Sequence, residues 1–433
     1  FVTPTPVAVP VSAGGTDQLV AAVAAPGGGF YAVGFQAPTF EATSDRSLLV
    51  VKLNGMGGLD TSFGGGDGIA TVNAHVGGAG EVYRGIVVQP SGKIVVSGTV
   101  EDEVVAADRD VVLVRLNSDG SVDNTFGTGG NGIVRLDLNT AIGTMGADST
   151  WGLATDATGR LYLHVAQRTE DLDAGNQPTL TDTDFAVVRV TAEGALDTGY
   201  ATGGKFRLDI QRSSANARGI HVFADGSVLA NGYAASTSTG NTVQPVIYKL
   251  TPGGTLDASF ASGGLFHEVV LAVQTEVYGI AIHPDGTFVT AGYGRQTGDT
   301  NDWVSLRFTA SGALDTAWAN NGRYVLDPTG TTAADNCRNA IALPGGRTAL
   351  VGSGGPANAT SDGYIAILDS TGKLDTAFGT GLLKFELGSN DAIWGGAVGS
   401  NGQRALFVGF KGGGMTPSAT SNDDAYAVSL ALP

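Results

Sequence analysis

The chain of 433 residues carries 41 acidic and 24 basic side chains, which gives a net charge of −17. Nucleic acids and anionic lipids are polyanions that need Lys and Arg for neutralisation, so this charge argues against both as partners. Apolar residues make up 42 %, enough for a large core, but no run approaches the ~20 residues of a membrane helix. We therefore expect no membrane insertion by this segment.

The first expected element is a short apolar strand within residues 5–12. Pro6 and Pro10 flank Val7 and Val9, and a proline has no backbone N–H to donate. A β-sheet tolerates this only on an edge strand. We predict that this strand completes the sheet formed by the end of the chain.

A phrase of the form LD-x-x-aromatic then recurs six times. Its aspartates lie 58 to 74 residues apart, at Asp60, Asp123, Asp197, Asp257, Asp315 and Asp375. Regular recurrence at such a period indicates an array of one supersecondary unit.

Each unit contains four short strands. In the second unit they are IVV from Ile86, KIVVSGTV from Lys93, DVVLVRL from Asp110 and GIVRL from Gly132, separated by Gly, Asp, Asn and Pro. A four-stranded unit cannot bury both of its faces alone, and radial closure of the array removes exposed sheet edges. The pattern therefore predicts a β-propeller.

The first strand of the unit occurs seven times. Its starts are Ala21, Gly85, Gly152, Gly219, Gly279, Asn339 and Gly395, each followed seven residues later by a hairpin glycine. Small residues at six of these starts suit an innermost strand, where neighbouring backbones crowd together. We predict an all-β, seven-bladed propeller of four-stranded antiparallel blades, closed by pairing of the N-terminal strand with the C-terminal blade. The expected blades are 17–73, 81–138, 147–210, 215–270, 276–327, 335–387 and 391–433 with 5–12.

The repeated residues of the LD phrase are expected to hold the fold. A residue needed once per blade suits a turn, with the aspartate accepting backbone N–H groups and the aromatic packing between blades. The glycines before the phrase are expected to adopt positive φ; they are Gly57, Gly120, Gly194, Gly254, Gly312 and Gly372.

The phrases LDTSFG, VDNTFG and LDTAFG, with their interval near sixty residues, resemble the delta-60 repeat of bacterial β-propellers, which is abundant in myxobacteria. The resemblance covers essentially residues 17–433. It implies a secreted or cell-surface propeller without agreed catalytic residues that could be transferred. The expected location is extracellular or on the outer cell surface.

The candidate binding residues stand just before six of the first-strand starts: Arg84, Trp151, Arg218, Tyr278, Arg338 and Trp394. Val20 stands at the same place in the first unit. In a propeller they would form a ring at the mouth of the central channel, with basic and aromatic residues alternating over six blades. Aromatic faces stack on sugars and guanidinium groups bind carboxylates, so the ring suits a glycan or protein ligand. The other interpretation is that the aromatics pack between blades while each Arg pairs with an Asp of its neighbour.

The sequence contains little that indicates a metal site. The single cysteine, Cys337, excludes a cysteine metal cluster and is expected to be a small buried filler. The stretch 117–123, with Asp119 and Asp123, resembles the opening of a calcium loop, but it lacks the completing Glu. The equivalents of Asp119 are Met56, Glu193, Gly253, Ser311 and Thr371, so we expect no cofactor and keep Ca²⁺ as the one candidate ion.

Two further sets of carboxylates remain open. An acidic loop in the third unit could gather a cation or simply be solvated; it contains Glu170, Asp171, Asp173, Asp182 and Asp184. A repeated third-strand aspartate suggests turn chemistry, at Asp110, Asp184, Asp302, Asp362 and Asp424.

Signatures of catalysis are weak, and we nominate no catalytic residue. The five histidines fall at unrelated positions in their units: His75, His164, His221, His267 and His283. No metalloprotease, nucleophile-elbow or phosphate-loop motif occurs. The sequence thus favours a non-catalytic extracellular or cell-surface binding or adhesion propeller. The alternatives are a polysaccharide-active lyase or hydrolase and a purely structural scaffold.

Overall fold

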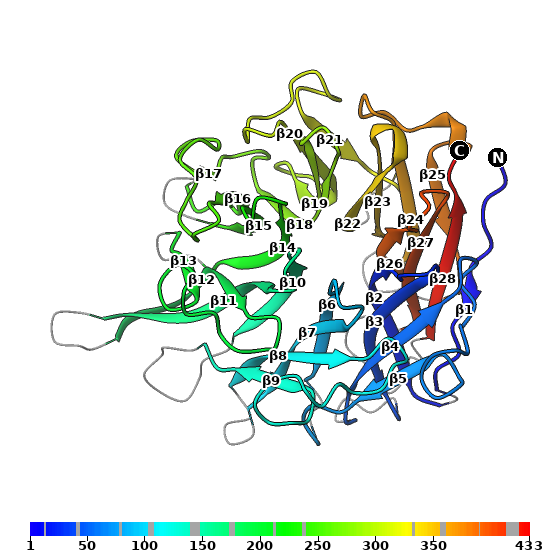
Figure 1. Ribbon diagram of the computed structural model, residues 1–433. Coiled ribbons are helices and arrows are strands. Elements are labelled where there is room, and N and C mark those ends of the chain that lie inside the picture. Colours follow the sequence, from blue (N-terminus) through cyan, green and yellow to red (C-terminus); the bar gives the residue numbers. More distant parts are fainter. Residues whose placement is uncertain are drawn as a thin grey trace. The chain divides into compact units, whose positions relative to one another are not determined.

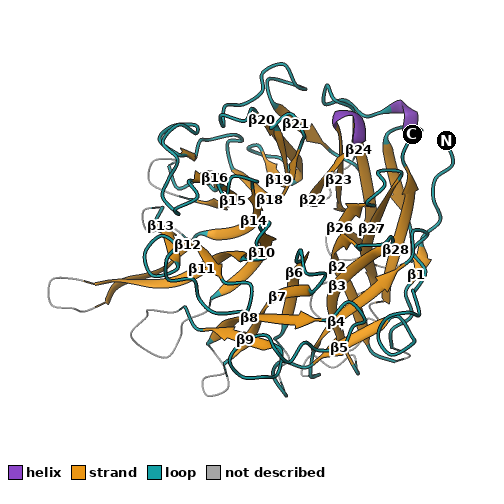
Figure 2. Cartoon of the chain, in the orientation of Figure 1, coloured by secondary structure: helices purple, strands orange, loops and turns teal. Residues whose placement is uncertain are grey.

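The computed structural model describes residues 1–12, 14–39, 44–77, 80–102, 108–138, 148–172, 178–210, 214–235, 240–330, 334–355, 361–388, 390–412 and 424–433. Seven four-stranded antiparallel sheets account for its strands (Figures 1 and 2). The predicted seven-bladed β-propeller is therefore confirmed. The chain divides into two compact units, residues 1–71 with 271–433 and residues 72–270, and each is described by itself.

The unit of residues 72–270 contains three blades. Blade 2 consists of β6 (Val82–Val88), β7 (Ile94–Glu101), β8 (Arg109–Leu116) and β9 (Ile133–Leu136). Blade 3 consists of β10 (Ser149–Thr155), β11 (Leu161–Leu172), β12 (Pro178–Val190) and β13 (Lys205–Leu208). Blade 4 consists of β14 (Asn216–Val222), β15 (Val228–Ala234), β16 (Gln244–Leu250) and β17 (Leu265–Phe266).

The other unit contains four blades. Blade 5 consists of β18 (Gln274–Ile282), β19 (Phe288–Arg295), β20 (Asp302–Phe308) and β21 (Arg323–Leu326). Blade 6 consists of β22 (Asn336–Leu343), β23 (Arg347–Gly354), β24 (Asp362–Leu368) and β25 (Leu382–Phe385), with short 3₁₀ turns η2 (Pro344–Gly346) and η3 (Thr376–Phe378). Blade 7 consists of β26 (Asn390–Val398), β27 (Arg404–Gly412), β28 (Asp424–Ala431) and β1 (Val7–Ala8). Blade 1 consists of β2 (Thr16–Ala24), β3 (Phe30–Ala37), β4 (Ser47–Leu53) and β5 (Ile69–Val72).

The two ends of the chain share blade 7, as predicted. Val7 pairs with Ala427 and Ala8 with Tyr426, and the Val9 N–H donates to the Ala425 carbonyl at 2.9 Å. Strand β1 is the edge of this sheet, which accommodates its flanking prolines. Among the described residues, no helix has the length and hydropathy needed to cross a membrane.

Blade 3 differs from the expected pattern in its second and third strands. Strands β11 and β12 continue past the rest of the blade as a paired hairpin up to Leu172 and Pro178 (Figure 1). Much of the acidic stretch expected as a loop is therefore β-structure. Asp173 and the side chains of Glu170 and Asp171 lie outside the described residues.

Apolar cores lie between adjacent blades. All six aromatics of the LD phrase are at most 2 % exposed. Four of them belong to clusters shared with the next blade: Phe126, Tyr200, Trp318 and Phe378. For these four the predicted inter-blade packing is confirmed.

The glycines before the LD phrase have φ between 82° and 93° at the six predicted positions. In three blades such a glycine lies beneath the aromatic of the preceding blade. A Cβ built on Gly254 would stand 2.8 Å from the ring of Tyr200. The glycine thus serves both the turn and the packing of the neighbouring blade.

The aspartate of the LD phrase has the predicted capping role in all six copies. Its Oδ1 accepts the N–H of the residue two positions later, as in Asp123 with Thr125 at 3.2 Å. Its Oδ2 forms an ion pair that the sequence interpretation missed. The bases are Lys52, Arg115, Arg189, Lys249, Arg307 and Arg347.

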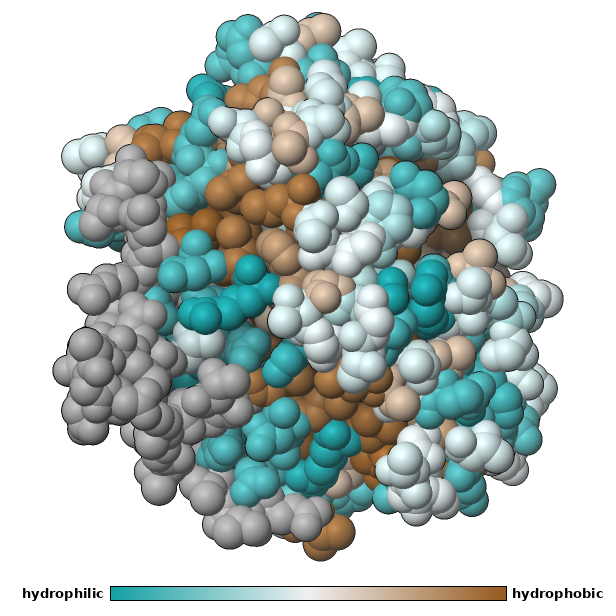
Figure 3. Space-filling view, turned by 60° about the vertical axis from the view of Figure 1, so that its left-hand side comes forward, coloured by the Kyte–Doolittle hydropathy of each residue, from teal (hydrophilic) through white to brown (hydrophobic). Residues whose placement is uncertain are grey.

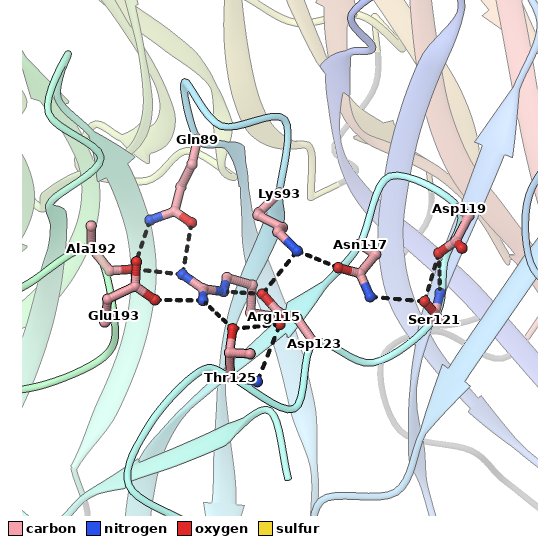
Figure 4. A network of polar contacts seen from close by, with 10 residues as sticks. All are labelled: Gln89, Lys93, Arg115, Asn117, Asp119, Ser121, Asp123, Thr125, Ala192 and Glu193. Atoms are coloured by element: carbon pink, nitrogen blue, oxygen red, sulfur yellow. Dashed lines mark hydrogen bonds and ion pairs between the residues drawn. The ribbon is translucent and has the colours of Figure 1, made fainter. Parts of the chain in front are cut away.

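The largest of these networks centres on Arg115 in blade 2 (Figure 4). Its Nε lies 2.8 Å from Asp123, and its other nitrogens donate to the Ala192 carbonyl at 2.7 Å and to Glu193 at 2.6 Å. Burial opposes ionisation of Asp123, but bonds from Thr125 and the charges of Lys93 and Arg115 lower its pKa to about 2. The network therefore joins blades 2 and 3.

Candidate functional site

Each of the six candidate residues, and Val20 at the same place in blade 1, occupies a β-bulge. In every first strand the pairing with the second strand shifts register at this position. The bulge residues, as we call them, are Val20, Arg84, Trp151, Arg218, Tyr278, Arg338 and Trp394. A bulge leaves a residue out of the ladder and re-aims its side chain, and bulges are frequent beside functional sites.

Three bulge residues of the unit 72–270 stack on one another. The guanidinium carbon of Arg84 lies 3.9 Å from the centre of the Trp151 ring, and that of Arg218 lies 4.2 Å from it. Trp151 of blade 3 thus contacts an arginine from each adjacent blade. Arg218 also lies over Tyr233, and its Nη2 donates to the Tyr233 hydroxyl at 2.6 Å.

The other unit repeats this arrangement around Arg338. Its guanidinium carbon lies 4.9 Å from the Tyr278 ring, 4.8 Å from the Trp394 ring and 5.5 Å from the Tyr293 ring. Tyr278 belongs to blade 5 and Trp394 to blade 7, so this arginine is also flanked from both sides.

The tyrosines beside Arg338 are linked to an acid. The Tyr278 hydroxyl donates to Glu276 at 2.9 Å and lies 3.1 Å from the Tyr293 hydroxyl. Tyr278 and Trp394 are only 6 % and 7 % exposed. Their rings therefore pack between blades, as the alternative interpretation expected, and they do not offer open faces for stacking on a sugar.

Crowding by the backbone of the next blade explains the small residues after the bulges, as predicted. A Cβ on Gly152 would lie 2.5 Å from the Arg218 carbonyl oxygen, and one on Gly395 would lie 2.5 Å from that of Val20. Both oxygens belong to the next blade of the same unit. Asn339 is the exception. Its own Oδ1 fills the space beside Gly279 of the preceding blade, where a Cβ on that glycine would lie 2.2 Å away.

The sequence analysis did not identify a second set of glycines, which lie in the second strand. In six blades a glycine of the second strand faces the bulge: Gly34, Gly98, Gly232, Gly292, Gly352 and Gly409. A Cβ on Gly292 would lie 1.8 Å from the Glu276 carbonyl oxygen. Blade 3 has Val165 at this place, so its bulge is accommodated differently. The repeated glycine at one position of the second strand was the available sequence signal.

The sequence analysis also did not identify the buried acids that lie three residues before the bulge. They are 1 % exposed or less: Asp17, Glu81, Asp148, Asp335 and Asp391. Burial raises the pKa of Asp148 and of Asp335 to about 7, and that of Asp17 and Asp391 to about 6. Asp148 accepts the N–H groups of Leu138 at 2.9 Å and Arg168 at 3.1 Å. These acids therefore anchor neighbouring segments to the first strand.

The raised pKa of Asp148 predicts a pH-dependent stability. Its contribution is fully present below the unfolded value of 3.8 and is lost as the pH rises through about 7. Asp148→Asn removes this dependence. From pH 4.5 to pH 8 its free energy of unfolding should rise, relative to the parent protein, by about 3 kcal/mol.

Urea unfolding of both proteins at several pH values measures this difference. Burial lowers the pKa of His164 to about 3, which acts in the opposite direction below pH 6.5 but is common to both proteins. Asp119→Asn, at an exposed turn, is the control and should show no such rise. A constant difference between parent and Asp148→Asn would contradict the role of burial.

The other carboxylate candidates are engaged in local contacts. Asp119 Oδ1 accepts both the N–H and the hydroxyl of Ser121, at 2.9 and 2.6 Å (Figure 4). Four third-strand aspartates form ion pairs rather than the expected turns: Asp110 with Arg135, Asp184 with Arg207, Asp362 with Lys384 and Asp424 with Lys411.

Two groups of three carboxylates could geometrically hold a hard cation. They are Asp182, Asp184 and Asp209, and Asp302, Asp327 and Asp335. Arg207 pairs with Asp184 in the first group. In the second, Gly355 and Thr329 donate to Asp335 at 3.1 and 3.3 Å. Hydrogen bonding within the blades thus already accounts for the buried member of each group.

A pocket of about 470 Å³ lies away from the bulge residues. It is lined by residues of β9, the adjoining turn, and residues Ala74, Gly194 and Ala195. None of the seven bulge residues contributes to its lining, so they do not form this pocket.

Comparison with known proteins agrees with the fold. Residues 89–126 and 224–260 match the family model described as "Domain of unknown function (DUF5122) beta-propeller". Both segments lie within repeat units and end at the aromatic of the LD phrase. No curated protein matches.

Solved structures resemble the chain at low identity. A protein of unknown function from Dyadobacter fermentans is 12 % identical, with a TM-score of 0.44, over 81 % of this chain and 95 % of that one. The Penicillium chrysogenum alpha-L-arabinanase complexed with arabinobiose is 13 % identical, with a TM-score of 0.45, over 81 % and 92 %. Polysaccharide lyase Uly1 is 10 % identical, with a TM-score of 0.47, over 95 % and 90 %. Glycan-active enzymes and a protein of unknown function are thus among the similar structures, and the likeness is to the fold alone.

Proposed function

We propose that the protein is a non-catalytic, extracellular or cell-surface module that binds a glycan through the bulge residues. The observation that carries this proposal is the recurrence of one bulge in seven first strands, six of which present Arg or an aromatic residue. Packing alone does not require such residues, because Val20 fills the position in blade 1. Cationic and hydroxyl groups held in fixed positions suit a ligand rich in oxygen.

A glycan is favoured over a protein ligand by the groups around the bulges. Protein interfaces usually centre on apolar and aromatic anchors. In the part of the chain that the structure describes, no bulge residue is among the exposed large apolar side chains, which are Phe1, Val2, Met56, Val76, Val269 and Val325. On the face drawn in Figure 3, hydrophobic areas are interrupted by hydrophilic residues.

Retention in gels containing polysaccharides tests this proposal. We expect the protein to be retarded by at least one member of a panel of neutral, uronate-containing and sulfated polysaccharides, without releasing products. Trp151→Ala combined with Trp394→Ala should weaken retention at least tenfold, since each indole holds a guanidinium group in place.

The buried Trp303 and Trp318 remain in this variant, and their fluorescence reports whether it is folded. Arg84→Ala combined with Arg338→Ala leaves all four indoles in place and gives the same test if the first variant unfolds. Retention that survives both pairs of substitutions would remove the bulge residues from the proposal.

A polysaccharide-cleaving enzyme is the second candidate, because arginine and tyrosine meet in both units. Arg218 donates to the Tyr233 hydroxyl, and Arg338 contacts Tyr278 and Tyr293. A tyrosine beside a cation can exchange protons with a substrate. New reducing ends or unsaturated sugars released from any member of the panel would favour this function over binding alone.

A further inference from the structure

Two of the arginines among the bulge residues, Arg218 and Arg338, differ in how their guanidinium groups are engaged. Arg218 is 8 % exposed and donates within its own blade to the Ala217 carbonyl at 2.9 Å and to the Tyr233 hydroxyl at 2.6 Å. Arg338 is half-buried. Its guanidinium group lies over three aromatic rings and, among the described residues, has no hydrogen-bond or ion-pair partner.

The difference has a local cause. Tyr233 follows Gly232 in the second strand of blade 4, and the residue at the same place in blade 6 is Ser353, after Gly352. Serine is too short to supply the hydroxyl that Tyr233 gives to Arg218. Arg338 therefore keeps the charge and the five N–H donors of a guanidinium group without an acceptor from its own blade.

The aromatic rings make Arg338 a fixed donor. Contacts with Tyr278 and Trp394 come from the preceding and the following blade. Arginine that stacks on aromatic faces still offers its planar edge to a carboxylate or sulfate, which it binds through two parallel hydrogen bonds. Side-chain freedom is already restricted, so little entropy is lost on binding.

We propose that Arg338 binds the carboxylate or sulfate group of an acidic polysaccharide, whereas Arg218 only supports the packing of its blades. This inference rests on the proposed glycan-binding function and names the charged group that is recognised. Glu276, which accepts from Tyr278, places a hydrogen-bond acceptor in the same cluster.

The net charge of −17 makes nonspecific binding of anionic polymers unfavourable, because the protein as a whole repels them. The probes are dextran, carboxymethyl-dextran and dextran sulfate, which share one backbone and differ in the charged group. We expect carboxymethyl-dextran or dextran sulfate to retard the protein and unmodified dextran to have no effect. Which of the two charged polymers acts distinguishes a carboxylate from a sulfate ligand.

Two substitutions address Arg338 in different ways. Arg338→Gln removes the charge, and Ser353→Tyr supplies the hydroxyl that engages the equivalent arginine in blade 4. Each should weaken retardation at least tenfold. Arg323→Gln, on the outer strand β21, is the matched control and should leave retardation unchanged.

Three results would overturn the inference. The first is retardation that persists in Arg338→Gln, and the second is equal retardation by unmodified dextran. The third is no retardation of the parent protein by either charged polymer. None of these decides the proposed function, because binding to a neutral polysaccharide of the broader panel would preserve it.

Discussion

Arg115→Ala is expected to lower the free energy of unfolding by about 3–5 kcal/mol, the usual cost of breaking a buried ion pair by removing one partner. Side chains of Arg115 and Asp123 are 4 % and 5 % exposed. The substitution leaves the Asp123 charge buried with Lys93 as its remaining base, at 3.3 Å. It also removes the bonds to Ala192 and Glu193 that join blade 2 to blade 3 (Figure 4).

The chain contains a matched control for this experiment. Lys249 occupies the same position in blade 4, where its pair with Asp257 is 3.5 Å long and the side chains are 23 % and 22 % exposed. Exposed pairs contribute about 0–1 kcal/mol, so Lys249→Ala should be nearly neutral in urea unfolding. Similar losses for both substitutions would show that burial does not set the strength of these pairs.

Gly292→Ala is expected to destabilise the protein by about 3 kcal/mol, because a side chain forced into a packed site displaces its neighbours. The new Cβ would lie 1.8 Å from the Glu276 carbonyl oxygen and 2.9 Å from the Val277 Cα, both backbone atoms. Strand β18 must therefore move where it forms the bulge at Tyr278. The contact between the Tyr278 and Tyr293 rings, with centres 5.5 Å apart, should change as well.

Gly253→Ala tests the same chemical change in open space. The nearest atom to its Cβ would be the Thr251 hydroxyl at 3.9 Å, and the φ of Gly253 is not positive. We expect a change within about 0.5 kcal/mol in urea unfolding. The near-ultraviolet circular dichroism of tyrosine should respond to Gly292→Ala alone; an unchanged spectrum in that variant would argue against a link between the glycine and the bulge.

The blade architecture could be predicted because the sequence repeats what each blade needs locally. The turn of Asp123, the φ of Gly120 and the ring of Phe126 all follow from residue types at fixed spacing. The bases of the ion pairs could have been found in the same way in five blades. In blade 6, Ile367 stands at that position and Arg347 comes from another strand, which only the fold reveals.

The candidate site was predictable in position but not in geometry. The residues before the first-strand starts were identified, yet their bulges depend on register with a second strand. The stacking of Arg338 between Tyr278 and Trp394 joins residues of three blades. Such contacts depend on how blades pack, which the spacing within one blade does not contain.

The sharing of blade 7 by both ends of the chain has a consequence for biosynthesis. Val7 and its partner Ala427 are separated by 420 residues of sequence, so Val7 is made long before Ala427. Pairing of residues so far apart in sequence is slow, and its entropic cost exceeds that of closing a hairpin. Strand β1 therefore has no partner in its sheet until β28 has been made, so this sheet is completed later than the sheets formed from consecutive strands.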